Sequence, residues 1–161
     1  MMSFTVEPLS RAQIRAVFPL IREAMPGLGL AAWLRFARGA TGTRRNIQSG
    51  VMVARRAGHD FPSGLFCFRV ERDPAMDKIL VAEHFVAIDI LHPRDVIAAL
   101  VGELDGLGQR LGCRAVRSVV HRSDVEGGLT QAGHANVGLL LGKALAASGI
   151  ATISGGGGAI V

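Results

Sequence analysis

The sequence predicts an α/β fold of the α+β kind, with a mixed, mostly antiparallel central sheet flanked by helices. Two helical patterns precede three apolar strand patterns that short loops connect, which favours an antiparallel meander. A strand pattern over 79–90, a helical pattern over 93–111 and a strand pattern over 114–120 then form one βαβ unit, which requires a parallel pair. The length of 161 residues suits a single domain.

The N-terminal elements follow from local signals. Residues 5–9 predict a short strand, and Ser10 with Gln13 fits a capping box at the start of a helix. We expect Pro19 to kink or split this helix, because proline lacks the N–H that a helix interior needs. A second amphipathic helix starts near Leu30 and ends near Gly39, and the basic segment up to Gly50 is expected to be an exposed loop.

The meander and the elements after it are expected in a fixed order. The strands of the meander are predicted at 51–55, 65–70 and 79–90. Pro93 suits the first position of the long helix, with His92 as its cap residue. After the strand at 114–120 we expect a short helix over 124–132 and a further strand over 135–145. We therefore assign residues 1–148 to the domain and residues 149–161 to an apolar, glycine-rich tail.

Composition limits the classes of function. Hydrophobic residues make up 49% of the chain and charged residues 19%, which is typical of a globular domain. No apolar run is long enough to cross a membrane, no secretory signal is visible, and the two cysteines are expected to be free thiols, so a cytoplasmic protein is predicted. Residues 1–58 hold nine arginines and two glutamates, yet the chain has no tyrosine and one tryptophan, so nucleic-acid binding is disfavoured.

The order of elements resembles that of the GNAT superfamily of N-acetyltransferases. The resemblance covers residues 4–145, and the stretch Leu-Thr-Gln-Ala-Gly-His over 129–134 is similar to the helix that ends in Leu-Gly-Phe or Ala-Gly-Phe in that family. It implies an acyl-CoA N-acyltransferase fold and transfer of an acyl group from acetyl-CoA to an amine. It also implies that the strand backbone holds the pantetheine arm and that the next helix holds the pyrophosphate; the implied positions are Phe85, Val86, Ala87, Ile88, Ile90, His92 and Arg94.

The sequence departs from the family at the pyrophosphate-binding turn. The family signature there is Gln/Arg-x-x-Gly-x-Gly/Ala, whereas this chain has Leu-His-Pro-Arg-Asp-Val-Ile over 91–97. Pro93 removes one N–H donor, and Asp95 places a carboxylate in the first helical turn, where a diphosphate would meet like charge. Arg94 and His92 only partly offset this change. The turn is therefore expected to be a degenerate form of the family's site.

Candidate catalytic residues follow from the resemblance and from strand alternation. The family base is often a glutamate on the central strand, and here Glu83 and Asp89 are expected on the face of the cleft, with His84 on the opposite face. The family acid is commonly a tyrosine, which this chain lacks, so His121 is the candidate replacement. The five histidines show no metal-ligand spacing, so no metal site is predicted.

Three functions stay open at this point. The first is an N-acetyltransferase that uses acetyl-CoA and an unidentified small-molecule or peptide amine. The second is a non-catalytic GNAT-like domain that has lost acyl-CoA binding and acts as a binding or assembly module, as the degenerate turn and the missing tyrosine suggest. The third is an arginine-led nucleic-acid binder. Unpaired terminal strands and the apolar tail also favour a homodimer.

Overall fold

A computed structural model describes residues 3–41 and 48–145, and within them five strands form one sheet in the order β1-β2-β3-β4-β5. The first four strands pair antiparallel and β5 lies parallel to β4, as the sequence predicts. In chain order the elements are β1 (Phe4–Pro8), the 3-10 turn η1 (Arg11–Gln13), α1 (Phe18–Ala24), α2 (Leu30–Ala40), β2 (Ser49–Arg56), β3 (Pro62–Asp73), β4 (Asp77–Ala87), α3 (Pro93–Arg110), β5 (Ala115–Ser118) and α4 (Ser123–Gln131).

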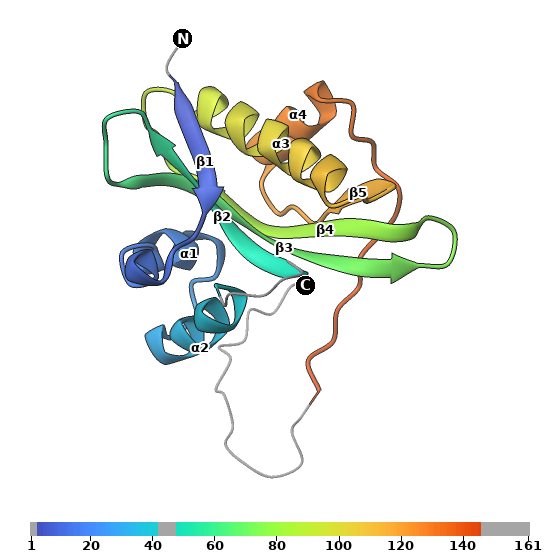
Figure 1. The fold of residues 1–161 in the computed structure, drawn as a ribbon, viewed down its shortest axis with the longest axis horizontal. Helices are drawn as coiled ribbons and strands as arrows, with labels where there is room; N and C mark the ends of the chain where they lie inside the picture. The colour runs from blue at the N-terminus through green and yellow to red at the C-terminus, as the bar shows by residue number, and fades with distance from the viewer. Residues whose placement is uncertain (1–2, 42–47, 146–161) are drawn as a thin grey trace, which may run out of the picture.

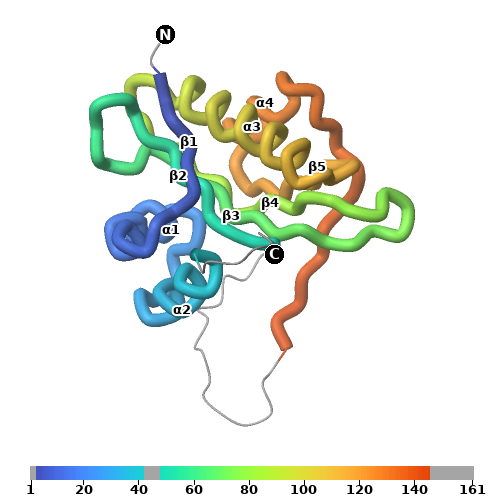
Figure 2. Tube along the Cα trace, viewed as in Figure 1, coloured from blue at the N-terminus to red at the C-terminus, as the bar shows by residue number. Residues whose placement is uncertain are grey.

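The sheet separates two hydrophobic cores. Helices α1 and α2 cover one face and α3 and α4 cover the other, as both views of the chain show (Figure 1, Figure 2). On the α1–α2 side the buried Trp33 donates a hydrogen bond to the Ile14 carbonyl oxygen at 2.7 Å. On the α3–α4 side Phe66 stacks on Phe85 with 5.3 Å between ring centroids. Alternate residues of each strand therefore face different helices.

The first helical segment is divided, as Pro19 predicts. The segment begins with η1, where the Ser10 N–H donates to Gln13 Oε1 at 3.3 Å, and α1 starts afresh at Phe18. Pro19 lies in the first turn of α1, where backbone N–H groups have no acceptor within the helix, so the absence of an N–H costs no hydrogen bond.

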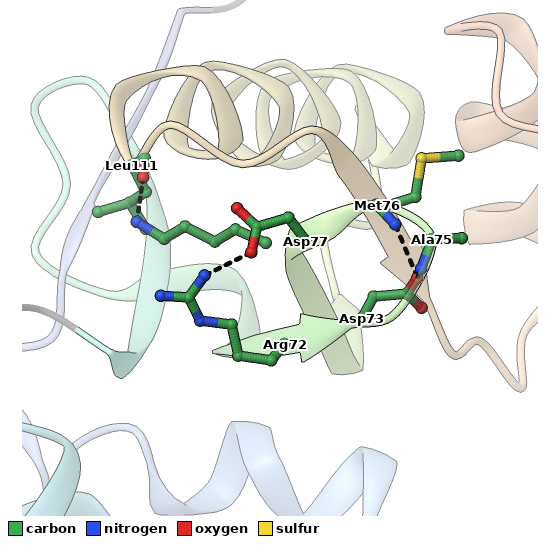
Figure 3. A network of polar contacts seen from close by, with 7 residues as sticks. Arg72, Asp73, Ala75, Met76, Asp77 and Leu111 are labelled. Carbon is green, nitrogen blue, oxygen red and sulfur yellow. Dashed lines mark hydrogen bonds and ion pairs between the residues drawn. The ribbon is translucent and has the colours of Figure 1, made fainter.

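A tight hairpin joins β3 and β4 at the far end of the sheet from the β4–α3 turn. The Asp73 carboxylate accepts hydrogen bonds from the backbone N–H groups of Ala75 and Met76, each at 2.9 Å, and Arg72 pairs with Asp77 at 2.5 Å (Figure 3). Lys78 donates to the Leu111 carbonyl oxygen at 2.5 Å, which ties the hairpin to the C-terminal end of α3.

Two predicted strands differ from the structure. The strand expected over 79–90 ends at Ala87, and the Ile88 and Ile90 side chains beyond it are 48% and 98% exposed. The strand expected over 135–145 is wrong, because this segment is irregular and exposed, and a strand needs a neighbour to supply its hydrogen bonds. The tail over 149–161 lies outside the described residues. No helix in the described part of the chain is long and apolar enough to cross a membrane.

Candidate functional site

Strands β4 and β5 separate midway along β4 and leave part of its edge open. Their paired residues run from Ile79 and Ala115 to Ala82 and Ser118, and the last backbone bond joins the Val119 N–H to the Ala82 carbonyl at 2.9 Å. Beyond this point β4 continues to Ala87 without a strand on that side among the described residues. The second half of β4 therefore extends beyond its pairing with β5.

A β-bulge reverses the orientation of the side chains just past the divergence. Cys67 of β3 pairs with Glu83 and Leu65 pairs with Val86, so Phe66 faces both His84 and Phe85. His84 has a φ of +57°, a conformation that is uncommon for a residue with a side chain. As a result Ala82 and Phe85 face the same core, whereas simple alternation would place them on opposite faces.

The bulge overturns the expected assignment of faces. Glu83 does not share a face with Phe85 and Ala87, which are buried on the α3 side. His84, expected on the face opposite Glu83, is about one-third exposed, and its Nε2 atom lies 3.9 Å from Glu83 Oε2. The structure thus brings His84 into the candidate site beside Glu83. No sequence signal marks an inserted residue of this kind, which is why alternation missed it.

Charged side chains surround this pair. Arg69 Nη1 lies 2.8 Å from Glu83 Oε2, and Arg69 Nε lies 2.5 Å from Glu71 Oε1. Desolvation by burial lowers the pKa of His84 below its ordinary value, the Glu83 charge opposes that shift, and His121 and Arg69 add to it. His84 is therefore mostly neutral at pH 7, and a neutral imidazole can accept a proton.

His121 is exposed, lies three residues after the end of β5, and its charge influences the pKa of His84. It comes from the other side of the divergence, because β5 ends at Ser118 while β4 continues. Glu83 and His84 thus lie side by side where the pairing with β5 ends, and the charge of His121 acts on His84 from the β5 side. The sequence predicted the first and the third of these residues.

The Asp89 carboxylate stabilises the turn between β4 and α3 through hydrogen bonds to the backbone. Asp89 Oδ1 accepts hydrogen bonds from the backbone N–H groups of Leu91 at 2.9 Å and His92 at 2.8 Å. These bonds, led by that from His92, lower the pKa of Asp89. Asp89, predicted as a candidate base, lies away from Glu83 and His84 on a turn that it stabilises. An aspartate shortly before a helix start is a known turn signal, and it identifies this role.

The predicted cofactor positions on β4 fall into two groups, according to whether their backbone groups face β3 or point away from it. The Ile88 N–H donates to the Ser63 carbonyl at 2.8 Å, on the β3 side. By alternation the backbone groups of Val86 also face β3, and those of Phe85 and Ala87 face the open side. The backbone groups of Phe85 and Ala87 therefore pair with no strand among the described residues, whereas those of Val86 and Ile88 are committed to β3; Phe85 and Ala87 are themselves buried. Ile90, His92 and Arg94 lie beyond the strand.

The cysteines do not contribute a nucleophile here. Cys67 and Cys113 are both free thiols. Burial raises the pKa of Cys67 to about 12, and the nearby Glu83 charge adds to this rise. A thiol with so high a pKa is protonated at neutral pH and is a poor nucleophile.

Comparison with solved structures gives close fold matches along nearly the whole chain. Aminoglycoside N-acetyltransferase AAC(6')-Iy with the bisubstrate analog CoA-S-monomethyl-acetylneamine matches with a TM-score of 0.74 and 13% identity, over 90% of this chain and 99% of that one. Glucosamine-6-phosphate N-acetyltransferase from Arabidopsis thaliana matches with a TM-score of 0.71 and 13% identity, over 88% and 97%. A Trypanosoma brucei acetyltransferase matches with a TM-score of 0.68 and 13% identity, over 89% and 100%.

These matches establish the fold, which is that of the GNAT acyl-CoA N-acyltransferases. No protein-family model and no curated protein matches the sequence. At such low identity the likeness concerns the course of the chain and its topology, so the function has to be argued from the site itself.

Proposed function

We propose that this chain is an N-acetyltransferase that moves an acyl group from a thioester of the acetyl-CoA type to a primary amine. The observation that carries the proposal is the open edge of β4 with a base-bearing cluster at its start. The cluster is formed by Glu83, His84 and His121, and the edge presents the backbone of Phe85 and Ala87. The fold matches, which include a CoA complex, support the same assignment.

The two parts of acetyl-CoA fit the residues to different degrees. The pantetheine arm carries amides, and the outward backbone groups of Phe85 and Ala87 can bind it in the manner of an added strand. The diphosphate has no comparable place at the β4–α3 turn, because Asp89 already accepts the N–H groups of Leu91 and His92. The fit is therefore to the arm and the thioester.

His84 is the residue best suited to accept the proton that the substrate ammonium must lose. Its imidazole is half-buried, and desolvation lowers its pKa, so it is free to take up a proton at neutral pH. The Glu83 carboxylate at 3.9 Å favours the imidazolium form that results. Glu83 is thus a positioning residue in this proposal, although it was first expected to be the base.

The remaining protons and bonds balance within the same cluster. The acyl transfer forms one C–N bond and breaks the C–S bond of the thioester, which leaves a thiolate that needs a proton. His121, three residues after β5, gives its proton to the thiolate in place of the missing tyrosine, and the second proton that the nitrogen loses as the amide forms restores it. An outward-facing N–H of the open β4 edge stabilises the charge that develops on the carbonyl oxygen.

The test is release of free thiol from acetyl-CoA in the presence of a panel of small-molecule and peptide amines. We expect amine-dependent release, which His84→Gln reduces by roughly 10²–10⁴-fold. His59→Gln, in the exposed turn between β2 and β3, is the matched control and leaves the rate unchanged. The proposal fails if no amine stimulates release and if acetyl-CoA also leaves the melting temperature unmoved. The alternative of a non-catalytic binding or assembly module then stands.

A homodimer in a cytoplasmic setting completes the proposal. The segment over 135–145 holds three consecutive leucines that are 69–85% exposed, and the outer edge of β5 has no neighbouring strand among residues 3–41 and 48–145. In a two-fold symmetric dimer, the apolar segment of each chain can cover the exposed strand edge of the other chain. The free thiols of Cys67 and Cys113 suit a reducing compartment.

A further inference from the structure

Two backbone N–H groups of the β4–α3 turn that could bind an anion are already occupied. One carboxylate oxygen of Asp89 accepts two backbone N–H groups, from Leu91 at 2.9 Å and from His92 at 2.8 Å. The next residue, Pro93, has no N–H to offer. A phosphate that bound here would have to displace the Asp89 carboxylate, whose hydrogen bonds are strengthened by its negative charge.

The charges along the turn are mixed, and two of them are carboxylates at the helix N-terminus where a phosphate would bind. Asp95 lies in the first turn of α3, with its Oδ2 atom 4.0 Å from His92 Nδ1. Both carboxylates are near the helix N-terminus, where each is stabilised by the helix dipole that a phosphate would otherwise use. Arg94 and Arg56 bring positive charge to this end of the sheet, and the Arg56 charge acts on Asp89 itself.

The edge of β4 beyond Ala82 carries no such competing carboxylate and pairs with no strand among residues 3–41 and 48–145. The backbone groups of Phe85 and Ala87 face away from β3, and the last bond to β5 lies back at Ala82. The strand edge that would bind the arm thus has no pairing strand, whereas two N–H groups of the turn that would bind the diphosphate are already bonded to Asp89. The two halves of an acyl-CoA molecule meet different conditions in this protein.

We propose that recognition of the acyl donor ends at its pantetheine arm, so that acyl-pantetheine is the donor unit and the nucleotide adds little. This inference rests on the proposed function. The same unit comes from free acyl-CoA or from a phosphopantetheine arm on a carrier protein. In either source the acyl group reaches His84 through the opening between β4 and β5.

The experiment compares three donors with the full-length chain: acetyl-CoA, S-acetylpantetheine, and an acetylated phosphopantetheine arm on a carrier protein. We expect kcat/KM for S-acetylpantetheine to lie within about threefold of the value for acetyl-CoA. One ordinary charged hydrogen bond to a phosphate would separate the two by roughly ten- to hundredfold. If the carrier-bound donor has a higher kcat/KM than both free donors, the carrier protein is the source of the acyl group. If acetyl-CoA and the carrier-bound donor have equal kcat/KM values, the protein recognises only the arm that the two share.

Binding measured by calorimetry decides the inference independently of turnover. We expect CoA and pantetheine to have dissociation constants within about threefold of one another, with little dependence on salt. A preference for CoA of a hundredfold or more would overturn the inference even if catalysis is confirmed. If no donor is consumed, the proposed function fails, and the comparison of CoA with pantetheine still reports on the turn.

Variants of the β4–α3 turn test whether Asp89 is the residue that prevents binding of the nucleotide. Asp89→Ala frees both N–H groups and is expected to tighten CoA binding at least tenfold, while pantetheine binding stays unchanged and reports that the opening is intact. Asp89→Asn keeps an acceptor oxygen but removes the charge, so its effect on CoA is expected to be smaller. Asp60→Ala, in the exposed β2–β3 turn, is the control. Equal CoA affinity in all three variants and the natural chain would contradict the role given to Asp89.

Discussion

The His84 imidazole lies 3.9 Å from the Glu83 carboxylate, although the two residues are neighbours in a strand and should point in opposite directions. The bulge opposite Phe66 makes this approach possible, and His84 accepts a positive φ to form it. A backbone conformation of this kind costs of order 1–3 kcal/mol. Such a cost at the point where β4 and β5 part is consistent with a function for the pair.

The pH dependence of activity tests His84 as the base. Burial lowers its pKa below 6.5, so the neutral base is present above that pKa and lost as the pH falls through it. We expect kcat/KM to rise with pH along an acidic limb whose midpoint lies below 6.5. His84→Gln should abolish this limb together with most of the rate. An acidic limb that persists in His84→Gln would assign it to another group.

The same shift makes folding stability depend on pH. Between the folded pKa of His84 and the unfolded value near 6.5, the unfolded chain binds more protons, so the free energy of unfolding rises with pH across this window. Above the window the contribution of His84 is constant. Urea unfolding from pH 4.5 to 7.5 should show a slope that is smaller in His84→Gln. An identical slope in both proteins would mean that His84 is not shifted.

The charges around His84 should move its pKa in opposite directions. Glu83 raises that pKa, so Glu83→Gln is expected to lower it further, whereas Arg69 and His121 lower it, so Arg69→Gln and His121→Asn are expected to raise it. Titration of the His84 ring by NMR measures each shift. Arg72→Gln, which breaks an exposed ion pair at the hairpin, is the control and should leave the titration unchanged.

The stability cost of these substitutions should be small. The Arg69 side chain is 45% exposed, and ion pairs at such sites contribute about 0–1 kcal/mol. A large loss of stability in Arg69→Gln would point instead to a structural role for the pair. The NMR shift and the unfolding midpoint together therefore separate the electrostatic effect from a change in the fold.

Regular patterns in the sequence predict the parts of this fold that depend on local rules. The meander and the βαβ unit follow from strand and helix periodicity, and Pro19 and Pro93 mark where helices begin. The reversal at His84 does not follow, because an inserted residue has no composition of its own and one extra residue changes every later face of the strand. The sequence therefore pointed to Glu83 and His121 as candidates, and alternation placed His84 on the opposite face.

The apolar run near the C-terminus has a strand-like sequence but does not form a strand. Val137 and Leu139–Leu141 have strand-like composition, yet they form no strand among the described residues. A strand depends on a partner for its backbone hydrogen bonds, and a sequence pattern does not say whether one is present. The same reasoning explains why Asp89 was misassigned: its chemistry suits a base, but two backbone N–H groups already bind it.

Gly64 should tolerate no side chain, because it lies where α3 packs against the sheet. A Cβ atom there would come within 2.8 Å of the Val86 carbonyl oxygen and of Val96 Cγ1. We expect Gly64→Ala to destabilise the fold by about 1–3 kcal/mol, measured by urea unfolding. Gly102→Ala is the matched control: its Cβ meets nothing within 4 Å on an exposed face of α3, so it should stabilise by about 0.5–1 kcal/mol. Equal effects from the two substitutions would contradict the packing at Gly64.

The exposed leucines after α4 should determine the oligomeric state. Leu139 and Leu141 are 85% and 84% exposed, and an apolar run of this kind is stabilised by covering it with a second surface. We expect the full-length chain to sediment as a dimer at micromolar concentration and Leu140→Asp to sediment as a monomer with an unchanged far-UV spectrum. Phe61→Asp is the control, because Phe61 is also 84% exposed but lies at the start of β3, away from this segment. A monomeric natural chain, or the same loss of dimer in both variants, would exclude the segment as the interface.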